Sequence, residues 1–342
     1  MTTAFSASLV NGPSGDPAVF VDFRFEARAL LLDLGDLATL PPRKMLRITD
    51  VFVSHTHMDH FCGFDRLLRV CLGRTAGLRL YGPPGLAAQV GHKLAAYTWN
   101  LVERYLADFV IEAWEFEGGA EIVGVRLRAW ARFQPEPIGP RPCPDGVLRD
   151  EAAFRVRATR LDHGIPCLAF AIEETAHVNV WKNRLLELGL PTGPWLKTLK
   201  HAVIAGAPDD TPVRASWRDR DGEHERVLSL GALRGDVVRL VPGETIAYVT
   251  DVAFHEENRR RVVDLARGAT RLFIECPFLH DDADQAAARA HLTARQAGAL
   301  ARSCDAGIVI PFHFSPRYTG REAELRAEVE AARAAPVRRE QR

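Results

Sequence analysis

The pattern of apolar and polar residues predicts strands and helices that alternate along most of the chain. Pro17–Asp36 first alternates and then becomes continuously apolar, with the β-branched and aromatic side chains typical of sheet strands. The short apolar run Asp50–Ser54 predicts a buried strand. From Phe61 to Cys71, apolar residues recur at steps of three and four, which predicts an amphipathic helix directly after that strand.

The middle of the chain contains strong turn signals. In LRLYGPPGL a further strand is stopped by the Gly-Pro turn at Gly82–Gly85. We expect a helix around Leu86–Leu106 to follow, and then strands through Ile122–Phe133. The segment Pro135–Gly146 is rich in proline and predicts a surface loop.

Strand patterns resume at Arg155 and continue to Glu173, after which residues 173–239 are irregular, charged and rich in turns. This change predicts an arm of residues 173–239 inserted into a single domain that spans residues 1–342. Three strands then alternate with helical stretches, in the segments ETIAYVTDV, RLFIECPF and IVIPFHF. Thr293 is a candidate N-cap of the last of these helices and Gly307 its candidate stop signal. The interleaving indicates an α/β layered architecture.

Composition excludes some classes of protein. The chain has 342 residues, of which 47% are hydrophobic, and its 44 basic and 44 acidic side chains balance, so any polyanion site must be local. The six cysteines lie far apart without CxxC pairs, and we expect them to be reduced and mostly buried in an intracellular, cytoplasmic protein. The first residues lack the pattern of a signal peptide, and no apolar run reaches the ~18 to 20 residues of a membrane span.

Candidate chemistry is concentrated in HTHMDH, directly after the predicted strand Asp50–Ser54. His55 and His57 are two positions apart and project to the same side of an extended chain, and Asp59 and His60 follow as the helix begins. Imidazole nitrogen and carboxylate oxygen are ligands that zinc binds at roughly 2.0 to 2.2 Å. Four such groups exceed the needs of one open site and suggest two metal ions. The structural alternative is a hydrogen-bonded turn that contains chance histidines.

This motif resembles the signature of the metallo-β-lactamase superfamily. The resemblance implies a four-layer αββα sandwich with two mixed sheets face to face, and three later residues at strand ends match its remaining motifs: His163, Asp251 and His313. It also implies that His55, His57 and His163 hold one metal ion, that Asp59, His60 and His313 hold a second, and that Asp251 bridges them. The two ions, most simply Zn²⁺, would lie about 3.5 to 4 Å apart, as in two-metal hydrolases.

Further stretches resemble the ribonuclease Z branch of that superfamily. They are the block His291-Leu292-Thr293-Ala294, the run from His313 to Arg317-Tyr318, the motif LDHGIP, and an arm-like segment with Gly193-Pro194. The resemblance implies an endoribonuclease that cleaves the 3′ extension of tRNA precursors by attack of a metal-bridging hydroxide, and also a homodimer. His291 would be the general acid, Asp59 would orient the nucleophile, and Arg317 would bind a phosphate oxygen.

Some residues depart from that family. Met58 stands where the family has glycine, and Glu275-Cys276-Pro277-Phe278 replaces a His-Glu-Ala-Thr block, which is expected to remove groups that tune His291. Lys197 and Lys200 lie near Gly193-Pro194 and suggest an arm that binds RNA, with a solvated structural protrusion as the alternative. Two other functions remain open: a hydrolase of a small phosphodiester, sulfate ester or lactone, and a weakly catalytic RNA-binding relative.

Overall fold

The computed structural model describes residues 5–24, 26–175, 177–241 and 243–336. The chain divides into two compact units, each described by itself. The larger unit contains residues 5–149, 156–172 and 245–342, and the smaller one contains 150–155 and 173–244. The predicted arm, residues 173–239, thus falls within the smaller unit.

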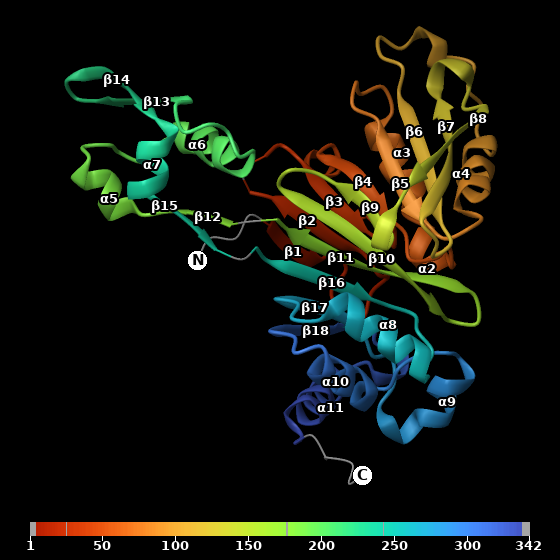
Figure 1. Cartoon of the computed structure of the whole chain (residues 1–342). Helices are drawn as coiled ribbons and strands as arrows, with labels where there is room; N and C mark the ends of the chain where they lie inside the picture. Colours follow the sequence, from red (N-terminus) through yellow and green to blue (C-terminus); the bar gives the residue numbers. More distant parts are fainter. Residues whose placement is uncertain (1–4, 25, 176, 242, 337–342) are drawn as a thin grey trace. The chain divides into compact units, whose positions relative to one another are not determined.

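Among the described residues, two mixed sheets form the centre of the larger unit (Figure 1). The first sheet has, in spatial order, the strands β1 (Phe5–Leu9), β2 (Val19–Phe23), β3 (Ala29–Leu32), β4 (Ile48–Phe52), β5 (Leu78–Gly82), β6 (Val110–Phe116), β7 (Glu121–Arg128) and β8 (Pro135–Pro142). The second has, in spatial order, β18 (Ile308–Phe312), β17 (Arg271–Glu275), β16 (Thr245–Val249), β11 (Pro166–Glu174), β10 (Phe154–Asp162) and β9 (Val147–Asp150). Strands β3 to β6 run parallel, as do β16 to β18.

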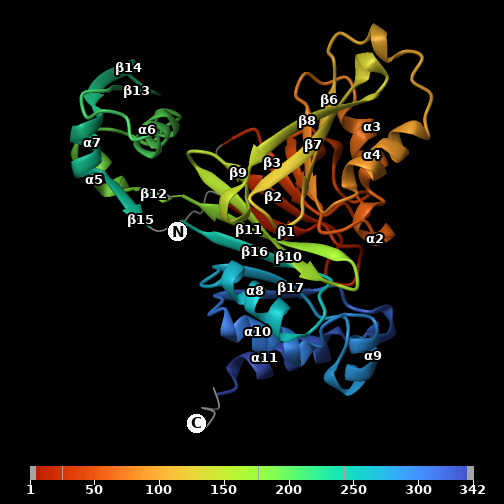
Figure 2. The same cartoon turned by 45° about the vertical axis from the view of Figure 1, so that its right-hand side comes forward.

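Helices cover the outer face of each sheet. Their bounds are α1 (Pro42–Met45), α2 (Met58–Phe61), α3 (Phe64–Cys71), α4 (Leu86–Ala95), α8 (Glu256–Ala266), α9 (Ala283–Ala288), α10 (Ala294–Ser303) and α11 (Glu322–Ala334). The helices α3 and α4 share one apolar core with β3 to β6, and α8, α10 and α11 share another with β16 and β17. The turned view shows the same two coverings (Figure 2). The expected layers of helix, sheet, sheet and helix are confirmed.

The two sheets meet through buried aromatic residues. Phe52 on β4 stacks on Tyr81 of β5 and lies 5.6 Å, ring to ring, from Phe170 on β11 of the other sheet. Strand β11 is apolar along almost its whole length because it is covered on both faces. Asp50 is the buried polar residue of β4, and its carboxylate lies 2.6 Å from Arg79 and 3.2 Å from Arg28.

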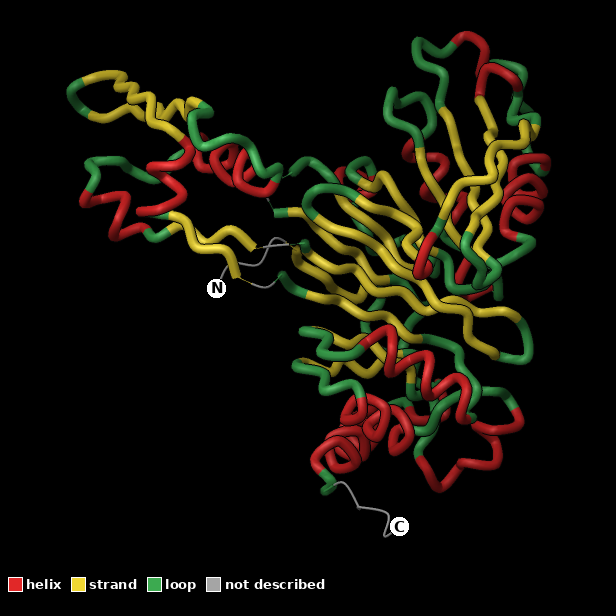
Figure 3. Tube along the Cα trace, viewed as in Figure 1, coloured by secondary structure: helices red, strands yellow, loops and turns green. Residues whose placement is uncertain are grey.

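The smaller unit has its own apolar core, which includes Leu185, Trp195 and Leu233. Its elements are the paired strands β12 (His177–Val180) and β15 (Val238–Val241), the hairpin β13 (Pro212–Asp219) and β14 (Gly222–Ser229), and the helices α5 (Lys182–Glu187), α6 (Trp195–Ile204) and α7 (Leu230–Asp236). Figure 3 shows these helices and strands in residues that the sequence pattern describes only as irregular. The pairing of β13 with β14 and the apolar core of this unit explain why the segment forms regular structure despite its irregular sequence pattern.

Three local predictions are wrong. The helix expected to reach Leu106 ends at Ala95, because Trp99 folds back and its indole N–H donates to the Leu94 carbonyl. The expected loop Pro135–Gly146 contains β8, which is an edge strand where prolines need not donate to a neighbour. Gly307 does not end α10, since that helix ends at Ser303 and Asp305 takes the left-handed conformation.

Other predictions hold. Thr293 caps α10 through a full capping box with Gln296. All six cysteines are free, and five of them are buried. Within the described residues, no helix combines the length and apolarity needed to cross a bilayer.

Candidate metal centre

The candidate residues gather at one edge of the larger unit because each lies where a strand ends. His55 and His57 follow β4, and α2 then begins at Met58, which places Asp59 and His60 in its first turn. His163 lies in the turn between β10 and β11, and Asp251, Glu275 and His313 stand at the carboxyl ends of β16, β17 and β18. Parallel strands bring such ends together, and side chains more than 250 positions apart therefore meet.

Backbone conformation turns several of these side chains into the site. Asp251 has φ 46°, His313 has φ 61° and Asp33, just after β3, has φ 59°. The left-handed region costs a non-glycine residue about 1 to 3 kcal/mol and is found most often at functional sites. Gly63 lies between α2 and α3 and packs closely against Gly35. A Cβ at position 63 would lie 2.1 Å from the Gly35 carbonyl oxygen, so this close approach requires glycine.

Asp251 is the centre of the arrangement, and each of its carboxylate oxygens faces a different set of imidazoles. Oδ2 lies 3.2 Å from His163 Nε2 and 3.5 Å from His55 Nε2. Oδ1 lies 3.3 Å from His60 Nε2 and 3.2 Å from His313 Nδ1. Asp251 is therefore shared between two clusters of potential ligands.

The structure brings the residues predicted as ligands into two of three groups of potential ligand atoms. His55, His57, His163 and Asp251 offer ligand atoms within 4.8 Å of one another, and so do Asp59, His60 and His313. On the second side, Asp59 Oδ2 lies 3.3 Å from His313 Nε2 and 3.5 Å from His60 Nε2. Together the two clusters are consistent with a dinuclear metal site. The alternative of a turn with chance histidines does not explain how distant residues join them.

The donor atoms have the electrostatics of a cation site. His55 Nε2 and His60 Nε2 are buried without a hydrogen-bond partner in the described structure, so both nitrogen atoms are left for a ligand at the cluster. Burial, helped by the charge of His60, lowers the pKa of His55 to about 2, so that this imidazole is neutral. Burial opposes protonation of His60 too, but Asp251 and Asp33 outweigh it and raise its pKa to about 10. The carboxylates thus favour a positive charge at this point.

Asp33 supports the clusters from behind, although the sequence prediction did not include it. Its buried carboxylate lies 2.8 Å from His60 Nδ1 and accepts hydrogen bonds from Tyr248 Oη at 2.6 Å and from the Ser54 hydroxyl at 2.7 Å. Such a contact orients a ligand imidazole and selects its tautomer. The signal that could have found Asp33 is its position at the end of the apolar run LLLD.

His291 lies beside both clusters. Its ring centre is 4.8 Å from that of His163 and 5.5 Å from that of His313. Its Nδ1 lies 2.7 Å from Glu275 Oε2, and the other oxygen of Glu275 accepts from the backbone N–H groups of Val252 and Leu292. Burial alone would lower the pKa of His291, but the Glu275 carboxylate outweighs it and raises that pKa.

One expectation about this region is therefore wrong. The block Glu275–Phe278 was expected to lack groups that tune His291, yet Glu275 itself holds this imidazole. Burial of Glu275 would raise its pKa, but the charge of His291 and their hydrogen bond lower it to about 2. The carboxylate therefore stays ionised and keeps its contact.

The residues predicted to bind substrate are divided between the larger and the smaller unit. Arg317 lies 3.4 Å from Asp282 and its guanidinium stands over the Phe278 ring. Gly193 and Pro194 directly precede α6 in the smaller unit, where Lys197 is exposed and Lys200 is half-buried. Gly193, Pro194 and Trp217 line a groove of about 470 Å³ within that unit.

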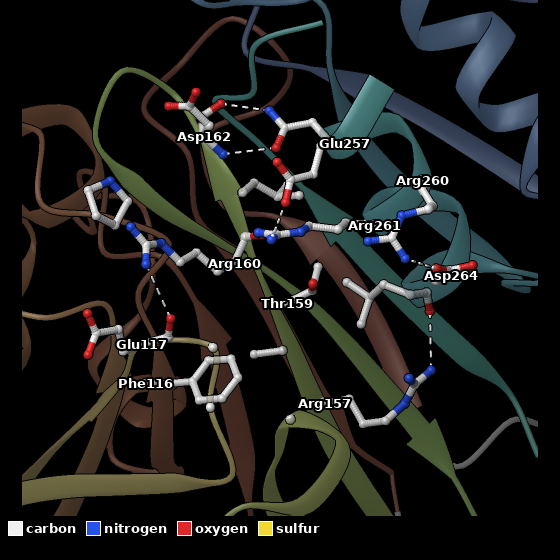
Figure 4. Close-up of a pocket in the computed structure, with 18 of the residues that line it drawn as sticks. Phe116, Glu117, Arg157, Thr159, Arg160, Asp162, Glu257, Arg260, Arg261 and Asp264 are labelled. Carbon is white, nitrogen blue, oxygen red and sulfur yellow. Dashed lines mark hydrogen bonds and ion pairs between the residues drawn. The ribbon is translucent and has the colours of Figure 1, made fainter. Parts of the chain in front are cut away.

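A larger groove of about 950 Å³ contains no member of either cluster, although Asp162 and Gly164 in its wall flank His163. Figure 4 shows its arginines turned toward the groove's own walls. Arg261 donates to the Arg160 carbonyl at 2.7 Å, and Arg260 lies 3.6 Å from Asp264. These charges hold the walls together, and the reactive groups instead face a smaller cavity of about 240 Å³ lined by Asp59, His291 and His313.

Known proteins resemble this chain along nearly its whole length. It is 33% identical over 342 residues to a protein of Deinococcus radiodurans named ribonuclease Z, with 96% of this chain and 95% of that protein covered. A protein of Crocosphaera subtropica with the same name is 30% identical over 297 residues, which cover 85% and 77% of the two chains. No model of a protein family matches the chain.

Solved structures give the fold. Human tRNase Z, short form, superposes with a TM-score of 0.53 at 18% identity over 92% of each chain. The metallo-β-lactamase-fold protein YhfI from Bacillus subtilis superposes with a TM-score of 0.53 at 15% identity, covering 96% of this chain and 92% of its own. The expected metallo-β-lactamase fold, two mixed sheets flanked by helices, is confirmed.

Proposed function

Because the chain belongs to the ribonuclease Z family of metallo-β-lactamase-fold proteins, we propose that it is a metal-dependent endoribonuclease that removes the 3′ extension of tRNA precursors. The observation that carries this proposal is that the two carboxylate oxygens of Asp251 face two different sets of imidazoles, and that His291 lies beside both sets. A phosphodiester needs neutralised phosphoryl oxygens, an activated water and a proton for the leaving oxygen, and this geometry offers a group for each.

The proposed ligand sets follow the two clusters. His55, His57 and His163 would hold one divalent ion, Asp59, His60 and His313 would hold the other, and Asp251 would join both. The fit rests on the buried, unpartnered Nε2 atoms of His55 and His60, which an ion would satisfy. When bound, the ions would acidify water and neutralise charge on the phosphate. The nitrogen-rich donor set suits Zn²⁺, although other transition metals accept it.

His291 is the proposed proton donor. Water attacks phosphorus, the bond from phosphorus to the 3′ oxygen breaks, and the leaving oxygen takes the proton that His291 carries. Glu275 raises the pKa of His291, which favours the protonated form that a general acid needs. The Asp59 carboxylate lines the cavity and is partly exposed, so it would orient the attacking water and pass the proton that this water loses to solvent.

The smaller unit is the proposed RNA-binding arm. Lys197 on α6 is exposed and forms no ion pair within the described part of the chain, whereas Arg184 on α5 is 2.7 Å from Glu187. Free cationic groups give RNA affinity by neutralising phosphates. The Gly193-Pro194 turn stands directly before α6 and would present Lys197 to the backbone of the RNA. The homodimer and the cytoplasmic location implied by the resemblance stay predictions, testable by sedimentation and by cell fractionation.

The primary test is incubation of the zinc-loaded protein with a tRNA that carries a 3′ extension, followed by mapping of the cut. We expect one cut that releases the extension, and none with the Asp251→Ala variant. Hydrolysis of bis(p-nitrophenyl) phosphate without any cut or binding of the tRNA at low salt would contradict the RNA substrate and favour a small-ester hydrolase.

The arm is tested separately by replacing residues 177–241 with a short glycine-serine linker. The ends of this segment lie side by side, because His177 and Val241 are paired in the antiparallel ladder of β12 and β15. We expect cleavage of the tRNA to fall far more than hydrolysis of the small diester. Lys197→Ala should have a milder form of the same effect, with Arg184→Ala as the matched control. Equal losses on both substrates would indicate a structural arm.

A further inference from the structure

The cavity of about 240 Å³ beside the metal centre has one cationic wall. One side is formed by Asp59, His291 and His313. The remaining lining residues are the loop from Ser14 to Pro17, the segments Pro277–Phe278 and Phe314–Pro316, and Arg289. The cavity thus brings one guanidinium group next to the proposed proton donor and the proposed ligands.

Arg289 and Arg317 both stand against the same buried ring but are engaged differently. Their guanidinium carbons lie 5.9 and 5.7 Å from the Phe278 ring centre. Arg317 lies 3.4 Å from the Asp282 carboxylate and does not line the cavity. Arg289 lines the cavity and, among the residues that the structure describes, forms no ion pair with a carboxylate. Arg289, whose side chain is exposed, is therefore the arginine that lines the cavity together with the reactive groups.

The backbone around Arg289 is fixed. Arg289 ends α9, and its N–H donates to the Gln285 and Ala286 carbonyls. Ala290 follows in the left-handed conformation with φ 56°, and its carbonyl lies 2.9 Å from His163 Nδ1. The His291 N–H then donates to Ala286. The segment Arg289–His291 thus positions the Arg289 side chain, the Ala290 carbonyl that contacts the proposed ligand His163, and the proposed acid His291.

The acidic groups of the cavity do not cancel this cation. Asp16 accepts a hydrogen bond from the Cys62 thiol at Oδ2, at 3.4 Å. Asp59 contacts His60 and His313 and belongs to the second cluster. Phe278 is 2% exposed, and its ring centre lies 5.9 Å from the guanidinium carbon of Arg289, within the range of a cation–π contact.

We infer that Arg289 binds a phosphoryl oxygen of the substrate in this cavity and makes the site selective for anionic diesters over neutral esters. This inference rests on the proposed function. A planar guanidinium fork matches two phosphoryl oxygens, and such charge-assisted bonds are stronger than neutral ones. A neutral lactone or carboxylic ester gives the fork no anion to bind. Arg289 thereby takes the role that the sequence resemblance implied for Arg317.

The test measures binding of inorganic phosphate to the zinc-loaded full chain by calorimetry, after unbound zinc is removed. We expect Arg289→Ala to weaken phosphate binding by about tenfold or more, the value of a hydrogen bond between charged groups, and Arg289→Lys to lose less. Arg295→Ala is the matched control, since Arg295 is the exposed second residue of α10, four positions after His291, and pairs with Glu328 outside the cavity. Unchanged affinity in Arg289→Ala, a larger loss in Arg317→Ala, or no phosphate binding by the wild type would overturn the inference.

A second experiment compares kcat/KM for bis(p-nitrophenyl) phosphate and for p-nitrophenyl acetate. Arg289→Ala should lower the value for the diester about tenfold or more and leave that for the neutral ester within about twofold. An equal loss on both esters would overturn the selectivity. Phosphate binding that depends on Arg289, in a wild type that cleaves no diester, would support the anion site and reject the proposed function instead.

Discussion

Replacing Asp33 by Asn tests how the second cluster is assembled. Asp33 Oδ1 accepts from the Ser54 N–H at 2.6 Å, and Oδ2 faces the Ser54 hydroxyl, Tyr248 Oη and His60 Nδ1. An asparagine must keep its oxygen toward the Ser54 N–H, which can only donate. Its NH₂ group then takes the place of Oδ2.

The consequences differ for the three groups that face Oδ2. The hydroxyls of Ser54 and Tyr248 can rotate and accept a hydrogen bond, but His60 Nδ1 can accept only after losing its proton. The proton of a neutral His60 then moves to Nε2, the atom that lies 3.3 Å from Asp251 Oδ1. This tautomer cannot bind a metal ion through Nε2. Loss of such a supporting contact usually costs about 10- to 100-fold in metal affinity, or about 1.4 to 2.7 kcal/mol.

The assay is titration of the apoprotein with zinc against a chromophoric chelator, which resolves the two equivalents. We expect Asp33→Asn to weaken the second equivalent by about 10- to 100-fold and the first one much less. Tyr248→Phe is the matched control: it removes one donor to Asp33, leaves the His60 contact, and should cost about 0.5 to 1.5 kcal/mol of stability. Two equivalents bound to Asp33→Asn with wild-type affinity would refute the tautomer argument.

Three further substitutions have defined outcomes. His291→Ala should lower turnover by about 10² to 10⁴, the share of general acid catalysis, with two zinc ions retained by elemental analysis; unchanged turnover would remove the proton-donor role. Asp251→Ala should lose zinc as well as activity, because this carboxylate faces both clusters, and a variant that keeps two equivalents would place the bridge elsewhere. Asp50→Asn should lower the free energy of unfolding by about 3 to 5 kcal/mol, because Arg79 and Arg28 face this buried carboxylate. Burial of Asp50 would raise its pKa, but Arg79 outweighs the effect of burial, and the pKa in the folded protein is lowered. The carboxylate therefore stabilises the fold fully above the ordinary pKa of an aspartate. This stabilisation is lost as the pH falls toward the lowered pKa of the folded protein. Wild-type stability should decline more steeply than that of Asp50→Asn below about pH 4, and parallel declines in chemical denaturation would contradict this.

Sequence patterns predicted the elements around the site better than those away from it. The strand before His55 and the capped helix after Thr293 are present because continuous apolar runs and a capping box are strong local signals. The β8 strand was missed since its prolines are tolerated only at a sheet edge, and edge position is a tertiary property. The arm was underestimated because its hairpin is stabilised by a core that its local pattern does not reveal.

The sequence by itself supplied the candidate ligands, since HTHMDH, His163, Asp251 and His313 each follow a strand pattern and match the motifs of the superfamily that the chain resembles. Only the tertiary structure decided that one carboxylate faces two imidazole sets, that Asp33 and Glu275 support His60 and His291, and that Arg289 rather than Arg317 lines the cavity. The physical reason is that these relations depend on the direction of side chains from strands far apart in the chain. Those directions are set by sheet order and by left-handed backbone at strand ends, which a linear pattern does not contain.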